Sequence, residues 1–226
     1  MILDRRAFIL QHTRPQSPPH APELTLYLAA EVEPIWRMTE EALQETGLEP
    51  PFWAFAWAGG QALARYVLDH PEEVRGRRVL DFATGSGMVA IAAMKAGAAS
   101  ALGSDIDLFC EAAVDLNASA NEVEVGFTGR DLLQAEAPDV DVILAGDICY
   151  QSAMAGRALP WLQAAHGRGT RVLLGDPGRA YLPGKGLQSL ARYEIQTTRD
   201  LEDREIRRTG VFTFRGGRGR EQTQNN

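Results

Sequence analysis

Cysteine is scarce in this chain of 226 residues, and the only two, Cys110 and Cys149, lack CxxC spacing. The sequence therefore indicates neither a disulfide framework nor a zinc site, and it favours a reducing compartment. Apolar runs stay well short of the ~18 consecutive residues that a membrane-spanning helix needs. Residues 1–6 place an acid where a secretory signal requires a basic and then an apolar segment. These absences predict a cytoplasmic protein.

Positive charge is also in the minority. Lys and Arg number 23 against 30 Asp and Glu, which gives a net charge of −7 and a pI near 5.2. This balance disfavours a surface built to bind nucleic acid or anionic lipid, and it leaves room only for a local basic groove. Hydrophobic residues make up 45% and charged residues 23%, which is typical of a soluble chain with a substantial core. We therefore expect no nucleic-acid and no membrane partner.

Short apolar runs alternate with helical stretches from Val79 onward, the pattern that βαβ units impose on a parallel sheet. The last two runs have only a charged turn between them, so they should form an antiparallel hairpin at the end of the sheet. The prediction is an α/β, Rossmann-like fold with a seven-strand, mostly parallel sheet and helices on both faces. The strands are expected over residues 79–83, 101–105, 123–128, 140–146, 170–175, 194–198 and 210–214.

Three regions are predicted along the chain. Residues 1–50 form an N-terminal cover with a Pro-rich start and a helix over 31–47, and residues 51–215 form the domain itself. Residues 216–226 are rich in Gly, Arg and Gln and should be a disordered tail. Helices of the domain are expected over 60–70, 88–96, 109–120 and 153–165, with a short one over 186–193. A covered sheet of this size is expected to be monomeric.

A glycine-rich loop joins the first strand to its helix. Gly85, Gly87 and Ala90 reproduce the pattern G-x-G-x-x-A, in which small residues let a ligand approach the backbone at a helix N-terminus. Asp105 ends the second strand, where a carboxylate can accept hydrogen bonds from both hydroxyls of a ribose. The combination predicts a nucleoside cofactor.

Asp81 helps to choose that cofactor. A carboxylate beside the loop repels a pyrophosphate but attracts the ammonium of an amino acid, which S-adenosylmethionine carries. The final antiparallel hairpin also departs from the usual dinucleotide-binding sheet. The alternatives that remain at this point are a capping or turn role for Asp81 and a nicotinamide-dependent oxidoreductase.

Asp147-Ile148-Cys149-Tyr150 follows the fourth strand, at the edge where open parallel sheets bind their ligands. This is where a methyl acceptor would meet the cofactor, unless Asp147 only caps the next helix. Cys149 has no neighbouring His or Lys in the sequence to lower its pKa, so a packed, inert thiol is expected.

With these residues placed, the chain resembles the class I, seven-strand S-adenosylmethionine-dependent methyltransferases. It is most similar to the lysine methyltransferase family that modifies the β-subunit of electron transfer flavoprotein. The similar segments are residues 51–66 (PFWAFAWAGGQALARY), 79–81, 105–107, 146–150 and 175–179 (GDPGR). One departure is Ala83, where the family commonly has glycine. A methyl group there should be tolerated if the backbone does not need a positive φ, and only cofactor affinity is affected.

The resemblance implies a role for each matching residue. Asp81, Gly85 and Gly87 hold the methionine end of the cofactor and Asp105 holds the ribose. Further cofactor contacts are implied for Asp131 and Leu132 beside the adenine, and for Trp57 and Gly60 from the N-terminal segment. Asp147 and Tyr150 line the acceptor channel as the catalytic residues, and no metal takes part. Trp53 is expected to pack in the core instead.

The mechanism expected from this resemblance is transfer of a methyl group to a lysine amine. Asp147 would orient the substrate ammonium by a charge-assisted hydrogen bond until solvent takes a proton. Tyr150 and Trp57 would form an aromatic wall that tolerates an alkylated cation. The alternatives are another protein lysine, for example in a ribosomal protein, a small-molecule acceptor, or a non-catalytic module that kept the fold.

Overall fold

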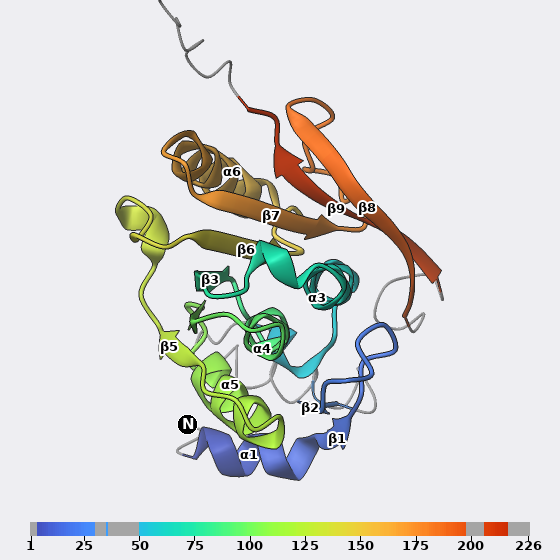
Figure 1. Ribbon diagram of the computed structural model, residues 1–226. Coiled ribbons are helices and arrows are strands. Elements are labelled where there is room, and N and C mark those ends of the chain that lie inside the picture. Colours follow the sequence, from blue (N-terminus) through green and yellow to red (C-terminus); the bar gives the residue numbers. More distant parts are fainter. Residues whose placement is uncertain (1–3, 30–34, 36–49, 198–205, 217–226) are drawn as a thin grey trace, which may run out of the picture.

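A seven-stranded sheet forms the centre of the protein in the computed structural model, which describes residues 4–29, 35, 50–197 and 206–216 (Figure 1). The strand order is β5-β4-β3-β6-β7-β9-β8. Strands β3 to β7 run parallel, whereas β9 pairs antiparallel with both β7 and β8. The predicted α/β sheet and its closing hairpin are therefore confirmed. The strands are β3 (Arg78–Phe82), β4 (Ser100–Ser104), β5 (Gly126–Thr128), β6 (Val142–Gly146), β7 (Arg171–Asp176), β8 (Leu187–Gln196) and β9 (Ile206–Phe214).

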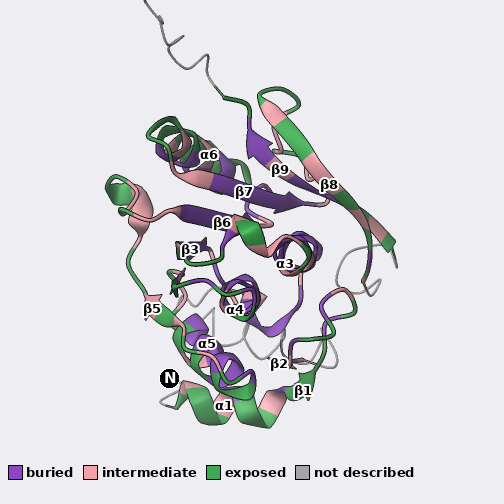
Figure 2. Ribbon diagram, viewed as in Figure 1, coloured by how far each residue is buried: buried purple, intermediate pink, exposed green. Residues whose placement is uncertain are grey.

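Two apolar cores lie on the two faces of this sheet because successive side chains of a strand point to opposite sides. In β6, Leu144 packs with residues of α3 (Ala58–Asp69) and α4 (Met88–Lys95), and Ile143 packs with residues of α6 (Ser152–Gly167). Helix α5 (Phe109–Ala120) lies beside α4 and β5. Figure 2 shows β6 and β7 mostly buried and β8 partly exposed. The predicted helices on both faces are confirmed.

The expected short helix over residues 186–193 is wrong. This segment is part of β8, a ten-residue strand that pairs with β9 from Leu187 to Gln196, with a bulge between Ser189 and Ala191. Leu, Gln, Ala and Arg favour helices locally, but the antiparallel ladder with β9 overrides that preference. The expected strand over 123–128 is also shorter than predicted, because only Gly126–Thr128 pairs with β4.

The N-terminal cover contains a helix and two strands that its sequence pattern does not predict. Helix α1 (Arg5–His12) is capped by Asp4, whose carboxylate accepts a hydrogen bond from the Ala7 N–H, and it packs against α5. A two-stranded ribbon of β1 (Arg14–Gln16) and β2 (Leu26–Leu28) follows. The helix predicted over 31–47 falls, apart from Ile35, outside the described residues, as does the tail from 217 to 226.

Asn117 of α5 connects this ribbon to the glycine loop. Its carbonyl oxygen accepts from the Tyr27 N–H at 2.7 Å, and its amide donates to the Ser86 carbonyl at 2.8 Å. Asn117 is fully buried, so both polar ends of its side chain are satisfied away from water. The N-terminal segment is thereby part of the structure that supports the loop.

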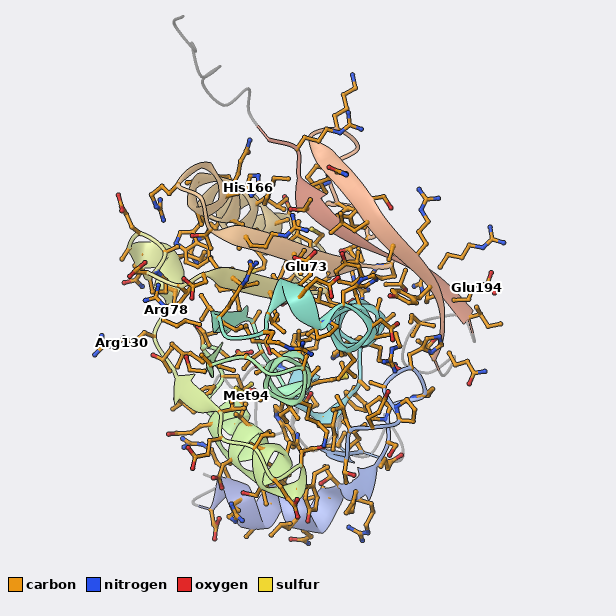
Figure 3. The ribbon with its side chains drawn as sticks, in the orientation of Figure 1. Glu73, Arg78, Met94, Arg130, His166 and Glu194 are labelled. Carbon is orange, nitrogen blue, oxygen red and sulfur yellow. The ribbon has the colours of Figure 1, made fainter. Side chains whose placement is uncertain are left out.

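The two ends of the sheet carry different groups. Arg78 begins β3 and Glu73 lies just before it, so both mark the end at which the parallel strands start (Figure 3). Glu194 lies far from them, near the end of the β8–β9 hairpin.

Among the described helices, none combines the length and apolarity that crossing a membrane requires.

Candidate active site

Helix α3 packs against the sheet through glycine. A Cβ placed on Gly59 would overlap the carbonyl oxygen of Gly175, and one placed on Gly175 would overlap the carbonyl oxygen of Gly59. A Cβ on Gly146 would lie 3.0 Å from the backbone of Gly60. The start of α3 therefore rests with its backbone directly on the ends of β6 and β7, which only glycine permits.

The glycine loop between β3 and α4 turns through left-handed conformations. Gly85 has φ 52° and Gly87 has φ 80°, and Gly87 is the N-terminal cap of α4. Ala83 also has a positive φ of 56°. The condition under which its methyl group was expected to be tolerated is therefore not met, since a non-glycine residue in this region costs roughly 1–2 kcal/mol. The loop keeps this strain because its surroundings fix it.

Asp81 holds the glycine loop in place through hydrogen bonds. Its Oδ2 accepts hydrogen bonds from the Thr84 hydroxyl at 2.6 Å and the Ala90 N–H at 3.0 Å. The capping role considered for Asp81 is thus real, and since both bonds go to Oδ2, Oδ1 is the atom available to a ligand. Asp81 is only 2% exposed, and this burial raises its pKa to about 7. A cationic partner would restore its charge.

Asp105 lies across the loop, just after β4. Its Oδ2 accepts from the Gly85 N–H at 3.0 Å, and its Oδ1 accepts from the Asp107 N–H at 3.1 Å. Burial raises the pKa of this carboxyl too, and these backbone hydrogen bonds partly offset the rise. Asp105 is therefore placed where its carboxylate can accept hydrogen bonds from the hydroxyls of a ligand.

One cavity of about 360 Å³ brings most of the predicted site together, a size within the range of ligand pockets, roughly 300–1,000 Å³. The cavity opens to solvent at Ile106, a lining residue next to Asp105 that is 60% exposed. Gly87 does not line this cavity but caps the helix beneath it. The predicted site residues that line it are Trp57, Gly60, Asp81, Gly85, Asp105, Asp147 and Tyr150.

Asp131 and Leu132 are not among the lining residues of this cavity. Asp131 caps the short helix η3 (Leu132–Gln134) and forms an ion pair with Arg157 at 2.8 Å. Leu132 packs against the core on the α6 face. Their implied contact with an adenine stays a prediction.

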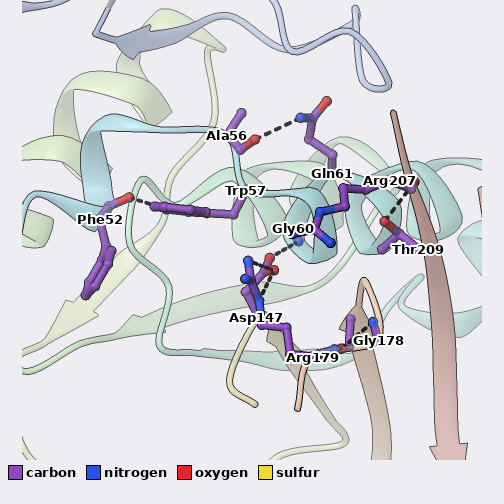
Figure 4. A network of polar contacts seen from close by, with 11 residues as sticks. Phe52, Ala56, Trp57, Gly60, Gln61, Asp147, Gly178, Arg179, Arg207 and Thr209 are labelled. Atoms are coloured by element: carbon purple, nitrogen blue, oxygen red, sulfur yellow. Dashed lines mark hydrogen bonds and ion pairs between the residues drawn. The ribbon is translucent and has the colours of Figure 1, made fainter. Parts of the chain in front are cut away.

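Asp147 is held in a strained conformation at the end of β6. It has φ 57°, and its N–H donates to the Gly175 carbonyl at 2.9 Å. Its Oδ2 accepts from the Gly60 N–H at 2.8 Å, and its Oδ1 accepts from the Arg179 guanidinium at 2.9 and 3.2 Å (Figure 4). The side chain therefore points toward α3 and the turn after β7, and it does not cap α6.

Arg179 has a place in the site that its sequence pattern does not predict. It belongs to the Gly-Asp-Pro-Gly-Arg turn, in which Asp176 accepts hydrogen bonds from the Gly178 and Arg179 N–H groups, both at 2.7 Å. Its guanidinium lines the cavity and lies 5.8 Å from the centre of the Trp57 ring. The distinctive turn was the available signal, but its partner is 32 residues away in the sequence.

Aromatic rings form one wall of the cavity. Phe52 contacts both Trp57 and Tyr150 edge-on, with ring centres 5.7 and 5.4 Å apart. The Trp57 indole N–H donates to the Phe52 carbonyl at 2.9 Å, which fixes the ring. Trp53 instead is 1% exposed and stacks on Phe109 at 5.5 Å, so its predicted place in the core is confirmed.

Cys149 is buried, so its expected packing in the core is confirmed, and burial raises its pKa to about 12. No group of three or more His, Cys, Asp or Glu side chains within the described ranges is arranged to hold a metal ion.

The strand order, the glycine loop and the two carboxylates that line one cavity define a class I S-adenosylmethionine-dependent methyltransferase. Solved methyltransferases share the fold. A ribosomal protein L11 methylase from Lactobacillus delbrueckii subsp. bulgaricus aligns with TM-score 0.53 at 22% identity, over 76% of this chain and 83% of that one. Magnesium protoporphyrin IX methyltransferase from Synechocystis PCC 6803 with bound SAM aligns with TM-score 0.51 at 17% identity, over 82% and 99%.

Sequence relatives identify the family within this class of methyltransferases. A family model of ribosomal protein L11 methyltransferase (PrmA) matches residues 61–149. The electron transfer flavoprotein beta subunit lysine methyltransferase of Xenopus laevis is 38% identical over 92% of this chain and 86% of its own length. The protein of the same name from Danio rerio is 34% identical over 93% and 83%. The chain belongs to the electron transfer flavoprotein β-subunit lysine methyltransferase family.

Proposed function

We propose that this protein transfers methyl groups from S-adenosylmethionine to a lysine of the electron transfer flavoprotein β-subunit. Membership of the family supports the substrate, since the relatives carry this activity in their names. The observation that carries the chemistry is the shared cavity, which is lined by the cofactor carboxylates Asp81 and Asp105 and by Asp147 and Tyr150 on the acceptor side. A cytoplasmic setting, which rests on composition, and a monomer, which rests on the size of the domain and its covered sheet, belong to the same proposal.

The described residues fit the cofactor. Oδ1 of Asp81 would accept a hydrogen bond from the methionine ammonium, and Asp105 would accept hydrogen bonds from the ribose hydroxyls. Gly85 lines the cavity without a side chain, so a ligand can approach the backbone of the glycine loop there. When bound, S-adenosylmethionine supplies an electrophilic methyl group on a sulfonium centre.

The acceptor side has to present a neutral amine. A free lysine has a pKa of ~10.4, so deprotonating it at pH 7 costs about 4.6 kcal/mol. Asp147 can orient the amine by a hydrogen bond, and solvent can take the proton. The aromatic rings of Phe52, Trp57 and Tyr150 favour a methylated ammonium by cation–π attraction and exclude water from it.

The test is mass spectrometry after incubation of purified electron transfer flavoprotein with the protein and S-adenosylmethionine. Mass increases in steps of about 14 Da on a lysine of the β-subunit are expected. The Asp147→Asn variant serves as the inactive control. Cofactor binding without any modified lysine would overturn the catalytic assignment.

A second candidate is a lysine of a ribosomal protein, because the L11 methyltransferase family model matches residues 61–149. Ribosomal proteins incubated in the same way separate the two candidates. Modification of a ribosomal protein with an unchanged flavoprotein would keep the chemistry and replace the substrate.

A further inference from the structure

Arg179 and Asp147 form an ion pair at the acceptor side of the cavity. The Arg179 Nε and Nη2 donate to the same oxygen, Oδ1 of Asp147, at 3.2 and 2.9 Å. Both side chains are largely buried, with 18% of the arginine and 13% of the aspartate exposed. Both also line the cavity, so a lysine amine that approaches Asp147 meets the guanidinium as well.

The pair is held from several sides. Gly60 of α3 donates to the other carboxylate oxygen, and the turn after β7 is fixed by Asp176 through the Arg179 N–H. The Trp57 ring lies against the guanidinium. A salt bridge of this geometry does not reorient freely, so its charge acts on the cavity from a fixed place.

Other titratable groups near the pair are few among the described residues. Asp176 is buried beside Arg179, and the Cys149 thiol lies close to both acids and to the guanidinium. Tyr150 lines the cavity on the acceptor side, and Asp81, Asp105, Asp107 and Cys110 line it on the cofactor side. Arg179 is thus the cationic lining residue among several acidic ones.

We propose that Arg179 is a positioning residue that neutralises Asp147, so that Asp147 orients the substrate amine without holding it as an ammonium. This inference rests on the proposed lysine methyltransferase function. A bare carboxylate would stabilise the protonated lysine and raise its pKa, which works against the neutral amine that attack requires. A guanidinium a few ångströms away has the opposite effect on the lysine.

The size of the effect follows from Coulomb's law. A unit charge about 6 Å away, with an effective dielectric constant of about 20–40, moves a pKa by roughly one to two units. The kcat profile reports the ionisation of the bound amine, so its rising limb gives that pKa directly. In the wild-type protein the midpoint of this limb should lie well below ~10.4, the value of a free lysine.

The test compares the kcat profiles of wild type, Arg179→Gln and Arg179→Lys between pH 6 and 10.5. Arg179→Gln should move the rising limb upward by about one to two pH units, with activity recovering at high pH. Arg179→Lys keeps the charge and should leave the limb within about half a unit of wild type, at a lower kcat because the forked geometry is lost. Calorimetry with S-adenosylmethionine should give similar affinities for all three proteins.

The matched control is Arg171→Gln, which removes a comparable ion pair with Glu73 at 2.8 Å, at the opposite end of β7. It should lower stability and leave the rising limb in place. A loss of kcat by the same factor at every pH in Arg179→Gln, or an equal shift of the limb in Arg179→Lys, would overturn the inference. So would a wild-type midpoint at pH 10 or above, a result that needs no variant. Methylation of the flavoprotein by the wild type decides the proposed function separately.

Discussion

The backbone N–H of Gly60 donates a hydrogen bond of 2.8 Å to Oδ2 of Asp147, across 87 residues of sequence. This bond ties the first turn of α3 to the end of β6. It exists because Gly59 lets the helix backbone approach Gly175 without an intervening side chain. The carboxylate of Asp147 is thus oriented by the start of α3, directly after the segment that supplies Phe52 and Trp57.

Gly59→Ala should destabilise the protein by about 1–3 kcal/mol or more, since a methyl group would overlap the Gly175 carbonyl. Displacement of α3 should also lower kcat, because Gly60 would move away from Asp147. Urea unfolding together with methylation kinetics measures both effects. The control is Gly156→Ala in α6, where a Cβ meets nothing within 4 Å and a gain of about 0.5–1 kcal/mol is expected. Equal stability of the two variants would show that the close approach does not matter.

Asp147→Asn should lower kcat at least about 100-fold while changing the dissociation constant of S-adenosylmethionine less than about threefold. Asp81→Asn should weaken cofactor binding about 10- to 100-fold, because it removes the charge opposite the methionine ammonium. Isothermal calorimetry and single-turnover kinetics measure the two quantities. An equal loss of cofactor affinity in both variants would reject this division of roles.

Cofactor affinity should depend on pH through Asp81, whose pKa burial raises to about 7 in the ligand-free protein. Binding an ammonium requires the ionised carboxylate, so the dissociation constant should rise about tenfold per unit as pH falls below 7. Calorimetry between pH 5.5 and 8.5 measures this dependence. Asp81→Asn should show a flat profile, and a flat profile in the wild type would contradict the prediction.

The same shift affects the stability of the ligand-free protein. The folded pKa of Asp81 lies above the ordinary aspartate value of 3.8, so the folded state binds more protons than the unfolded state between these two values. Its contribution to the free energy of unfolding is fully present below pH 3.8 and is lost as pH rises through about 7. Urea unfolding at pH 5.5 and 7.5 should therefore show a smaller loss of stability in Asp81→Asn than in wild type. A larger loss in the variant would reverse the assigned sign.

Ala83→Gly should raise the free energy of unfolding by about 1 kcal/mol, because the residue has φ 56° and glycine adopts this conformation without steric cost. Thermal unfolding should shift upward by about 2–4 °C for a chain of this size. Ala164→Gly on the exposed face of α6 is the matched control and should lose about 0.5–1 kcal/mol. A destabilised Ala83→Gly variant would mean that the loop is not strained at this position.

Much of the fold follows from local sequence patterns. The apolar run of β6 is buried on both faces, and the alternation of such runs with helices predicts the parallel sheet and the position of the glycine loop. The short connection before β9 predicts the antiparallel hairpin. By contrast, residues 187–193 of β8 favour a helix locally, and only the ladder with β9 makes them part of a strand.

The site, like the fold, could be predicted from the sequence only in part. Asp81, Asp105 and Asp147 could be placed from the sequence because each lies near or just after the end of a predicted strand, and parallel strands end at one edge of the sheet. The sequence could not pair Asp147 with Arg179 or Gly60, nor show that Asp81 caps its own loop and that Ala83 is strained. These features depend on two aspects of the packing. One is which backbone segments lie so close together that no Cβ fits between them, and the other is which charged side chains are buried next to one another. Sequence patterning therefore determined the sheet and the edge at which the chemistry lies, while packing of distant segments decided the orientation and the charge of the groups there.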